Sequence, residues 1–131
     1  MADEVKRFQY PGPTAPGARD RGPENGRSYD LIYNETVIST VQVMEKGQGN
    51  KLHYHNDQDG YWLVLGGKAR FHGEGETVIG DLGPFEGIFI PHYTRYWFES
   101  IDDEPLQILR VSKLRPVEPG ERRGPGVRIN G

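Results

Sequence analysis

The sequence has 131 residues, enough for one domain with a single hydrophobic core and no second domain. Its formal net charge of −3 and sequence pI of about 5.8 create no general basic field, so neither nucleic acid nor an anionic membrane is expected as a partner. The absence of cysteine excludes disulfides, thiolate metal ligands and a cysteine nucleophile. A small polar molecule is therefore the expected partner.

Segments rich in proline and glycine flank a central domain. Residues 1–27 hold four prolines and four glycines and form a predicted N-terminal arm, which we expect to lie along its own domain or to be exchanged with a partner subunit. Residues 113–131 hold three prolines and four glycines and form a predicted C-terminal tail. The predicted domain, residues 28–112, carries six basic and thirteen acidic residues. Charges near the N-terminus replace the apolar stretch of a signal peptide, so a cytoplasmic protein is expected.

The central domain is predicted to consist almost entirely of strands. Short runs of β-branched and aromatic residues alternate with clusters of Gly, Pro, Asn and Asp, and helix signals are nearly absent. The predicted strands are residues 36–44, 51–55, 60–65, 68–72, 76–80, 87–91, 96–100 and 106–112. Many short strands with regular turns favour an all-β sandwich or barrel, and closure of a barrel removes exposed edges.

His53 and His55 are the first candidates for a chemical role. On a strand, side chains two residues apart point to the same face, so both imidazoles can direct a nitrogen to a common point. Divalent transition metals are bound by nitrogen ligands on a rigid support of this kind. The alternative, from these two residues alone, is a pair of interior histidines hydrogen-bonded to polar neighbours.

The stretch around these histidines resembles the first sequence motif of the cupin superfamily. In that motif a glycine is followed by five residues, His-x-His, three or four residues, a glutamate, six residues and a second glycine. Gly47, His53, His55 and Gly67 match this pattern.

Residues 85–96 are similar to the second cupin motif, where Pro91 and the apolar strand before it match. Together the two motifs extend the resemblance over residues 36–112. The resemblance implies a single double-stranded β-helix, the jelly-roll barrel, with the proline- and glycine-rich segments as arms. Because cupins are commonly dimers, it also implies a homodimer.

A metal cupin resembling this chain would supply three histidines and one carboxylate or amide. Depending on which of the two closing glycines is counted, the glutamate position falls on Asp59 or on Gly60. Glycine has no ligand atom in a side chain. We therefore expect a loop one residue longer than usual to bring Asp59 to the metal, with Gln58 or Asp57 as less favoured substitutes.

The histidine expected in the second motif falls on Tyr96. A phenol has a reference pKa of about 10 and is a poor ligand unless a cation lowers it. Tyr96 is accordingly predicted to be catalytic, as an acid, a base or a weak ligand. His92 precedes a predicted turn and is expected at the surface or at the rim of the pocket.

Three further residues are predicted to line the substrate pocket. Tyr61 and Trp62 point to opposite faces of their strand, so one of them should line the pocket and the other should pack outside it. Arg110 lies inside a predicted strand, as does Arg70, where a guanidinium needs a partner. That partner is either an acidic residue such as Glu99 or an anionic substrate.

The preferred interpretation is a small cupin that binds Fe, Mn, Ni or Zn through His53, His55 and Asp59 and acts on a polar small molecule. A metal-free isomerase or dehydratase that uses His and Tyr as acid and base is one alternative. A non-catalytic cupin that only binds a small molecule is the other, because one fold hosts many roles. The type of reaction stays open.

Overall fold

The computed structural model describes residues 4–121 and the backbone of residues 127–128, so part of the predicted tail and the first three residues lie outside the described residues. The described residues form strands and no helix, and therefore contain no helix able to span a membrane. The strands are β1 (Arg19–Asp20), β2 (Arg27–Tyr33), β3 (Val37–Met44), β4 (His53–Tyr54), β5 (Gln58–Gly66), β6 (Ala69–His72), β7 (Val78–Leu82), β8 (Gly87–Ile90), β9 (Trp97–Ser100), β10 (Leu106–Leu114) and β11 (Val127–Arg128). All eight predicted strands are present, with small shifts at their ends.

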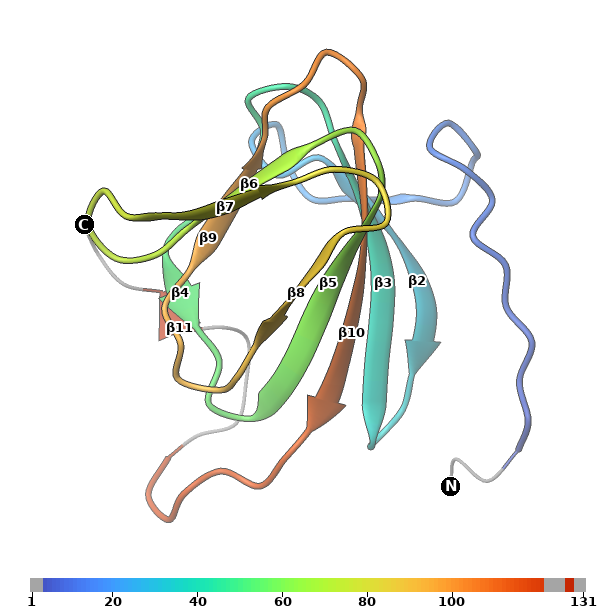
Figure 1. Ribbon diagram of the computed structural model, residues 1–131. Helices are drawn as coiled ribbons and strands as arrows, with labels where there is room; N and C mark the ends of the chain where they lie inside the picture. The colour runs from blue at the N-terminus through green and yellow to red at the C-terminus, as the bar shows by residue number, and fades with distance from the viewer. Residues whose placement is uncertain (1–3, 122–126, 129–131) are drawn as a thin grey trace.

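Two antiparallel sheets form the walls of the barrel (Figure 1). The larger sheet has the order β1-β2-β3-β10-β5-β8, and the smaller sheet has the order β7-β6-β9. A third, two-stranded pairing joins β11 to β4. The predicted all-β, double-stranded β-helix fold is confirmed.

Strand β10 is the centre of the larger sheet and sets its register. It pairs along its length with β3 on one side and with β5 on the other. Arg110 stands between Thr40 of β3 and Trp62 of β5, so these side chains share one face of the sheet. That face is the inner one, because Trp62 is buried whereas its neighbour Tyr61 is 45% exposed.

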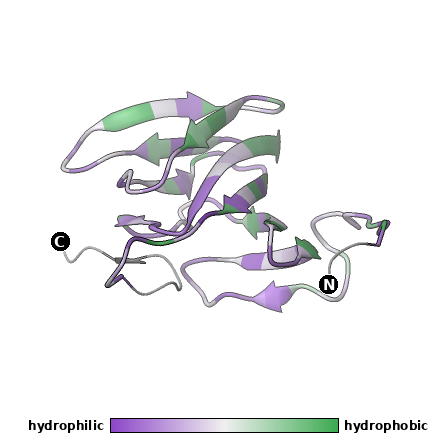
Figure 2. Cartoon of the chain, turned by 90° about the horizontal axis from the view of Figure 1, so that it is seen from below, coloured by the Kyte–Doolittle hydropathy of each residue, from purple (hydrophilic) through white to green (hydrophobic). Residues whose placement is uncertain are grey.

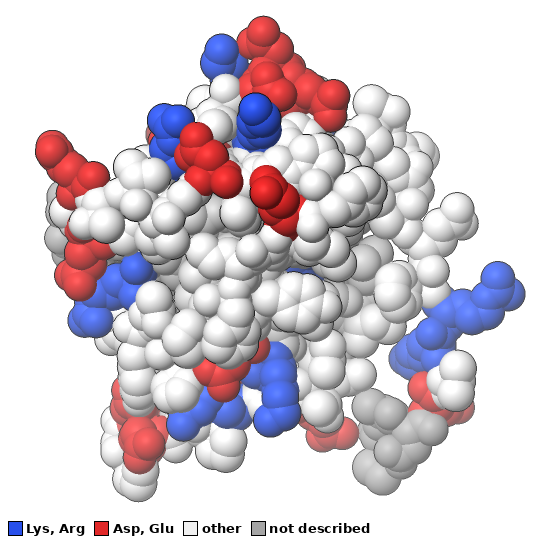
Figure 3. Space-filling model, viewed as in Figure 1, with Lys and Arg blue, Asp and Glu red and all other residues white. Residues whose placement is uncertain are grey.

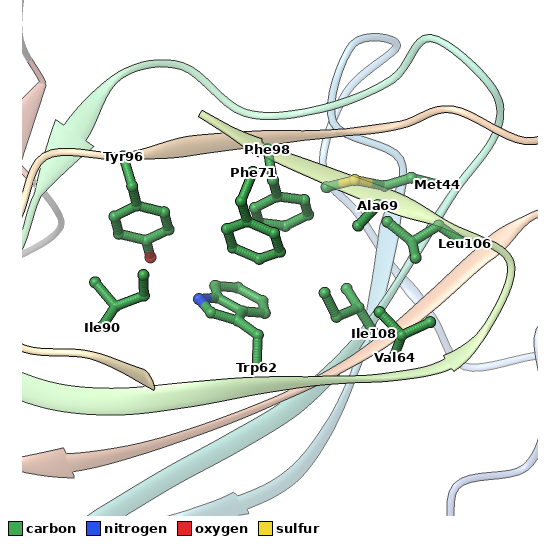
Figure 4. Packing of buried hydrophobic residues seen from close by; sticks show 10 residues of the cluster. All are labelled: Met44, Trp62, Val64, Ala69, Phe71, Ile90, Tyr96, Phe98, Leu106 and Ile108. Atoms are coloured by element: carbon green, nitrogen blue, oxygen red, sulfur yellow. The ribbon is translucent and has the colours of Figure 1, made fainter. Parts of the chain in front are cut away.

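The hydrophobic core fills one half of the barrel between the two sheets. Trp62 rises from the larger sheet, and Phe71, Tyr96 and Phe98 meet it from the opposite wall (Figure 4). The ring centroids of Trp62 and Phe98 are 4.8 Å apart, and those of Phe71 and Phe98 are 4.9 Å apart. The strongest hydrophobic stretches in Figure 2 accordingly lie on strands. This aromatic cluster closes one end of the barrel interior and leaves space at the other end.

The sequence analysis missed strands β1 and β2, which it placed in the arm or left unassigned. Part of the arm lies on the outer face of the larger sheet. The Tyr29 hydroxyl donates to the Ala15 carbonyl oxygen at 2.6 Å, and the Tyr10 hydroxyl donates to Oε1 of Gln107 at 2.8 Å. Tyr29 is therefore buried although it lies on the side of the sheet away from the barrel interior. These contacts hold β1 and β2 against the rest of the barrel.

We expect Phe71→Ala to lower the free energy of unfolding by about 3–5 kcal/mol, because it opens a cavity among fully buried rings. Phe89→Ala is the matched control, because Phe89 is 62% exposed and its truncation should change stability by about 1 kcal/mol or less. Chemical denaturation followed by circular dichroism measures both. Equal losses in the two variants would contradict the core assignment.

We also expect Gly60→Ala to be destabilising, by about 1–3 kcal/mol. A Cβ at Gly60 would lie 2.7 Å from the carbonyl oxygen of Val111 and 2.8 Å from Oγ of Ser112. Gly80→Ala in β7 serves as the control, because a Cβ there meets nothing within 4 Å. The same denaturation experiment compares them, and a neutral Gly60→Ala variant would show that β5 and β10 can separate at this point.

Candidate functional site

A pocket of about 650 Å³ opens into the half of the barrel that the aromatic core leaves free. It is lined by inward-facing residues of β3, β5 and β10, by the segment that carries the histidines, and by residues of β1, β2 and the turn between them. This volume is in the range of small-molecule sites. The lining is rich in polar and charged side chains, so the expected occupant is a polar molecule.

The structure brings His53, His55 and Tyr96 together on the wall of this pocket. The ring centroids of the two histidines are 4.9 Å apart, and that of Tyr96 lies 4.6 Å from His53 and 6.4 Å from His55. Backbone hydrogen bonds hold the arrangement, because His53 and Tyr96 exchange N–H···O bonds of 3.1 and 3.0 Å. The short strand β4 thus positions the first histidine directly opposite the tyrosine.

Hydrogen bonding and burial define the protonation of the two imidazoles. Nδ1 of His53 lies 2.6 Å from the carbonyl oxygen of Lys51, which can only accept, so Nδ1 carries a proton. Nδ1 of His55 is buried and has no hydrogen-bond partner among the described residues. Burial, together with electrostatic interactions with Arg110 and His53, lowers the pKa of His55 to about 3. His55 is therefore neutral at pH 7.

Tyr96 is a neutral phenol rather than an anionic ligand. It is 2% exposed, and burial raises the pKa of its hydroxyl, although Arg110 and the Trp62 indole act in the opposite direction. The indole nitrogen of Trp62 faces this hydroxyl (Figure 4). Tyr96 can donate a hydrogen bond to a ligand, and it does not supply negative charge for a metal.

Asp59 does not join the histidines, contrary to the expectation that it is the third ligand. Its carboxylate accepts hydrogen bonds from the backbone N–H of His92 at 2.8 Å and from the His92 ring Nδ1 at 2.7 Å. Asp59 is absent from the pocket lining, whereas Gln58 belongs to it. The reason is strand alternation, because Gln58 points inward from β5 and the next residue must then point outward. His92 is partly exposed beside Asp59.

The inward positions of β5 near the histidines are Gln58 and Gly60, and neither can be anionic. Gln58 is buried, and its Oε1 accepts a hydrogen bond from a terminal nitrogen of Arg110. Gly60 packs against Ser112, its partner on β10. The position at which the resemblance places a metal-binding carboxylate is thus occupied by an amide, a glycine and a guanidinium.

Tyr61 and Trp62, the two aromatic residues predicted to line the pocket, point to opposite faces of β5, as strand alternation requires. Trp62 is 4% exposed and lines the pocket. Tyr61 lies on the outer face and is 45% exposed, so the prediction that it lines the main pocket is wrong. It borders only a second cavity of about 10 Å³, which is too small for a substrate.

Arg110 lies in the pocket as predicted, and the two arginines of the strands have different partners. Arg70 pairs with Asp81 at 2.8 Å, and not with Glu99, which instead contacts His72 at 2.7 Å. Nε of Arg110 donates to Oγ of Ser112 at 3.0 Å.

The sequence analysis missed several residues that line the pocket. Thr40 and Gln42 point inward from β3, and Arg19 and Arg21 reach the mouth from β1 and the turn after it. A signal existed for the β3 pair, because polar residues at alternate positions interrupt an otherwise apolar strand. No local signal marked the arginines, because a proline- and glycine-rich arm has no periodicity from which a face can be assigned.

A divalent transition metal is the group that the resemblance to metal cupins implies, and the donor set does not fit it. The pocket offers the imidazoles of His53 and His55 and the carboxylate of Asp57, which also supports the charge of Arg110, whereas Tyr96 is protonated and Asp59 lies outside the pocket. The guanidinium of Arg110 is close enough to lower the pKa of His55, so it also repels a cation bound there. Within the described residues, no three His, Cys, Asp or Glu side chains come together in a group that could hold a metal ion.

Comparison with known proteins relates this fold to one family. The cupin domain family profile matches residues 40–112, which is more than half of the chain and runs from β3 into β10. Over 103 residues the chain is 27% identical to oxalate decarboxylase OxdC of Bacillus subtilis (strain 168), and the match covers 69% of this chain and 26% of that protein. The chain therefore corresponds to about a quarter of the length of this curated relative.

Solved structures agree at the level of the fold. KdgF from Halomonas sp. superposes with a TM-score of 0.65 at 18% identity, over 76% of this chain and 89% of that chain. An RmlC-like cupin protein from Desulfovibrio desulfuricans gives a TM-score of 0.66 at 18% identity, over 84% and 97% of the two chains. Together with the family match and the jelly-roll barrel, these likenesses establish that the chain belongs to the cupin superfamily.

Proposed function

We propose that this cupin binds a small polar molecule inside its barrel and does so without a tightly held divalent metal. The observation that carries the proposal is the composition of the pocket wall. The inward residues of β5 nearest the histidines are an amide and a glycine, a guanidinium is hydrogen-bonded to that amide, and a neutral phenol replaces a histidine. Such a wall offers hydrogen bonds to a ligand and little to a cation.

The polar groups of the pocket suit the recognition of an uncharged or negatively charged ligand. Tyr96 is a hydrogen-bond donor, and the neutral imidazole of His55 also lines the pocket. Neither side chain carries a charge that a neutral or anionic ligand would have to oppose. Thr40 and Gln42 add further hydrogen-bonding groups on the opposite wall.

The neutral imidazole of His55 on the pocket wall supports a second candidate function, which is metal-free proton transfer. A neutral imidazole can accept a proton from a bound molecule, and the nearby phenol of Tyr96 can donate one. This candidate is tested by following with NMR the incorporation of deuterium from the solvent into a compound incubated with the protein. Incorporation should be slower with the His55→Ala variant than with the parent protein. The name of the curated relative also makes oxalate a compound to include in any screen.

Metal content is the first measurement. Protein purified without a histidine tag should contain well under one equivalent of Fe, Mn, Ni or Zn per chain by elemental analysis, because no three potential ligands come together among the described residues and a guanidinium lies near the imidazoles. His53→Ala should leave this low value unchanged. Near-stoichiometric metal that is lost in His53→Ala would contradict the proposal and establish the metal-dependent alternative.

Ligand binding is tested by thermal shift in the presence of EDTA. Polar metabolites that bind should raise the unfolding temperature in a concentration-dependent way without added metal. Thr40→Val should weaken the shift by about two- to tenfold in apparent affinity, because it removes one hydrogen bond from the pocket wall. Thr77→Val is the matched control, since Thr77 is exposed outside the pocket. Shifts that appear only after metal is added would count against metal-independent binding.

A further inference from the structure

Arg110 is a buried guanidinium whose hydrogen-bond partners are neutral. It lies between Thr40 and Trp62 in the middle of the larger sheet. Its Nε donates to Ser112, one terminal nitrogen donates to Gln58, and its Cζ lies 5.7 Å from the ring centroid of Trp62. A guanidinium has five N–H donors, so donors are left over for a molecule in the pocket.

Arg110 has no ion pair within residues 4–121, unlike Arg19 at the pocket mouth and Arg70 outside the pocket. Arg19 and Arg70 each approach a carboxylate at 2.8 Å, those of Asp30 and Asp81. Burial, with a contribution from Arg21, lowers the pKa of the Arg110 guanidinium, and electrostatic interactions with Tyr96 and Asp57 oppose this shift. A buried charge is destabilising unless it is paired, so a counter-ion supplied by a ligand would be stabilised here.

The rest of the pocket is also more positive than the domain that contains it. Besides the buried guanidinium, Arg19, Arg21 and Lys51 line the pocket, against Asp30 and Asp57. The central domain as a whole carries six basic and thirteen acidic residues. On the face shown in Figure 3, basic and acidic residues are interspersed rather than gathered into one basic field. The excess of positive charge is therefore a local property of the pocket.

We propose that the ligand of this pocket is a small organic carboxylate, whose carboxylate group binds the guanidinium of Arg110. This inference rests on the proposed function and names its ligand class. A planar, singly charged carboxylate matches the planar fork of one guanidinium, whereas a phosphate dianion would bring more charge to this depth than one cation balances. The body of the molecule lies against Thr40 and Gln42 of β3, which supply hydrogen bonds.

Trp62 provides a direct readout, because its ring lies beside the guanidinium. The chain has two tryptophans, and Trp97 stacks on His72 in the smaller sheet, so a Trp97→Phe background leaves Trp62 as the reporter. The probes are glycolate and lactate, each with its uncharged amide, and inorganic phosphate, all in EDTA at constant ionic strength set with sodium chloride. Titration of Trp62 fluorescence gives an apparent affinity for each probe.

We expect the carboxylates to give a saturable change, with the amides and phosphate at least about tenfold weaker. Arg110→Met should weaken carboxylate binding by about tenfold to a hundredfold and leave amide binding unchanged. Arg110→Lys should retain part of the affinity for carboxylates, because lysine keeps the positive charge but lacks the planar guanidinium that can bind both carboxylate oxygens. Arg70→Met is the matched control, an arginine on a strand outside the pocket, and should bind like the parent.

Each contrary result has a distinct meaning. Amides that bind as tightly as the carboxylates would overturn this inference and leave the proposed polar-ligand pocket intact, and tighter binding of phosphate would overturn the choice of carboxylate. No saturable change with any probe would overturn the inference, and the proposed function would then depend on the wider thermal-shift screen. Arg110→Met should unfold at the same or a higher temperature than the ligand-free parent, since it removes a buried charge. If that variant does not fold, the preference of the parent for acids over amides decides the question.

Discussion

The pairing of β10 with both β3 and β5 is the constraint on which the site depends. Two neighbours hold β10 in continuous register from Ile108 to Lys113, so the phase of its alternation cannot slip. Because of this register, the side chain of Arg110 points into the barrel, as do its partners Thr40 on β3 and Trp62 on β5. A shift of one residue would place every polar group of this wall on the outside and every outer apolar residue in the pocket.

A guanidinium inside a barrel changes which ligands the barrel favours. Arg110 and a divalent cation at the two histidines would repel each other in a partly buried site, where screening is weak. The protonated state of Tyr96 and the neutral state of His55 follow from the same burial. The pocket therefore keeps the histidine pair of a metal cupin within an electrostatic setting suited to neutral or anionic groups.

The cupin barrel provides the walls of this pocket. The aromatic cluster limits how far the pocket extends, and the segment before the family match adds positive charge at its mouth. The aromatic cluster of Trp62, Phe71 and Phe98 closes one half of the interior and limits the pocket to the other half. At the mouth, Arg19 and Arg21 come from a segment held to the sheet by hydrogen bonds of the arm. The family match begins at residue 40, so these arginines lie outside the part that this chain shares with the family profile.

The sequence by itself determined eight of the strands, the all-β class, the shared face of His53 and His55, and the presence of Tyr96 and Arg110 in one domain, because these follow from local alternation and turn residues. Tertiary structure decided that Gln58 rather than Asp59 faces the histidines, and that Trp62 rather than Tyr61 lines the pocket. Alternation fixes which residues share a face, but only pairing with distant strands fixes which face is the inner one. The place of Arg19 and Arg21 at the mouth likewise depended on long-range contacts, because a segment without periodicity carries no information about the surface it will cover.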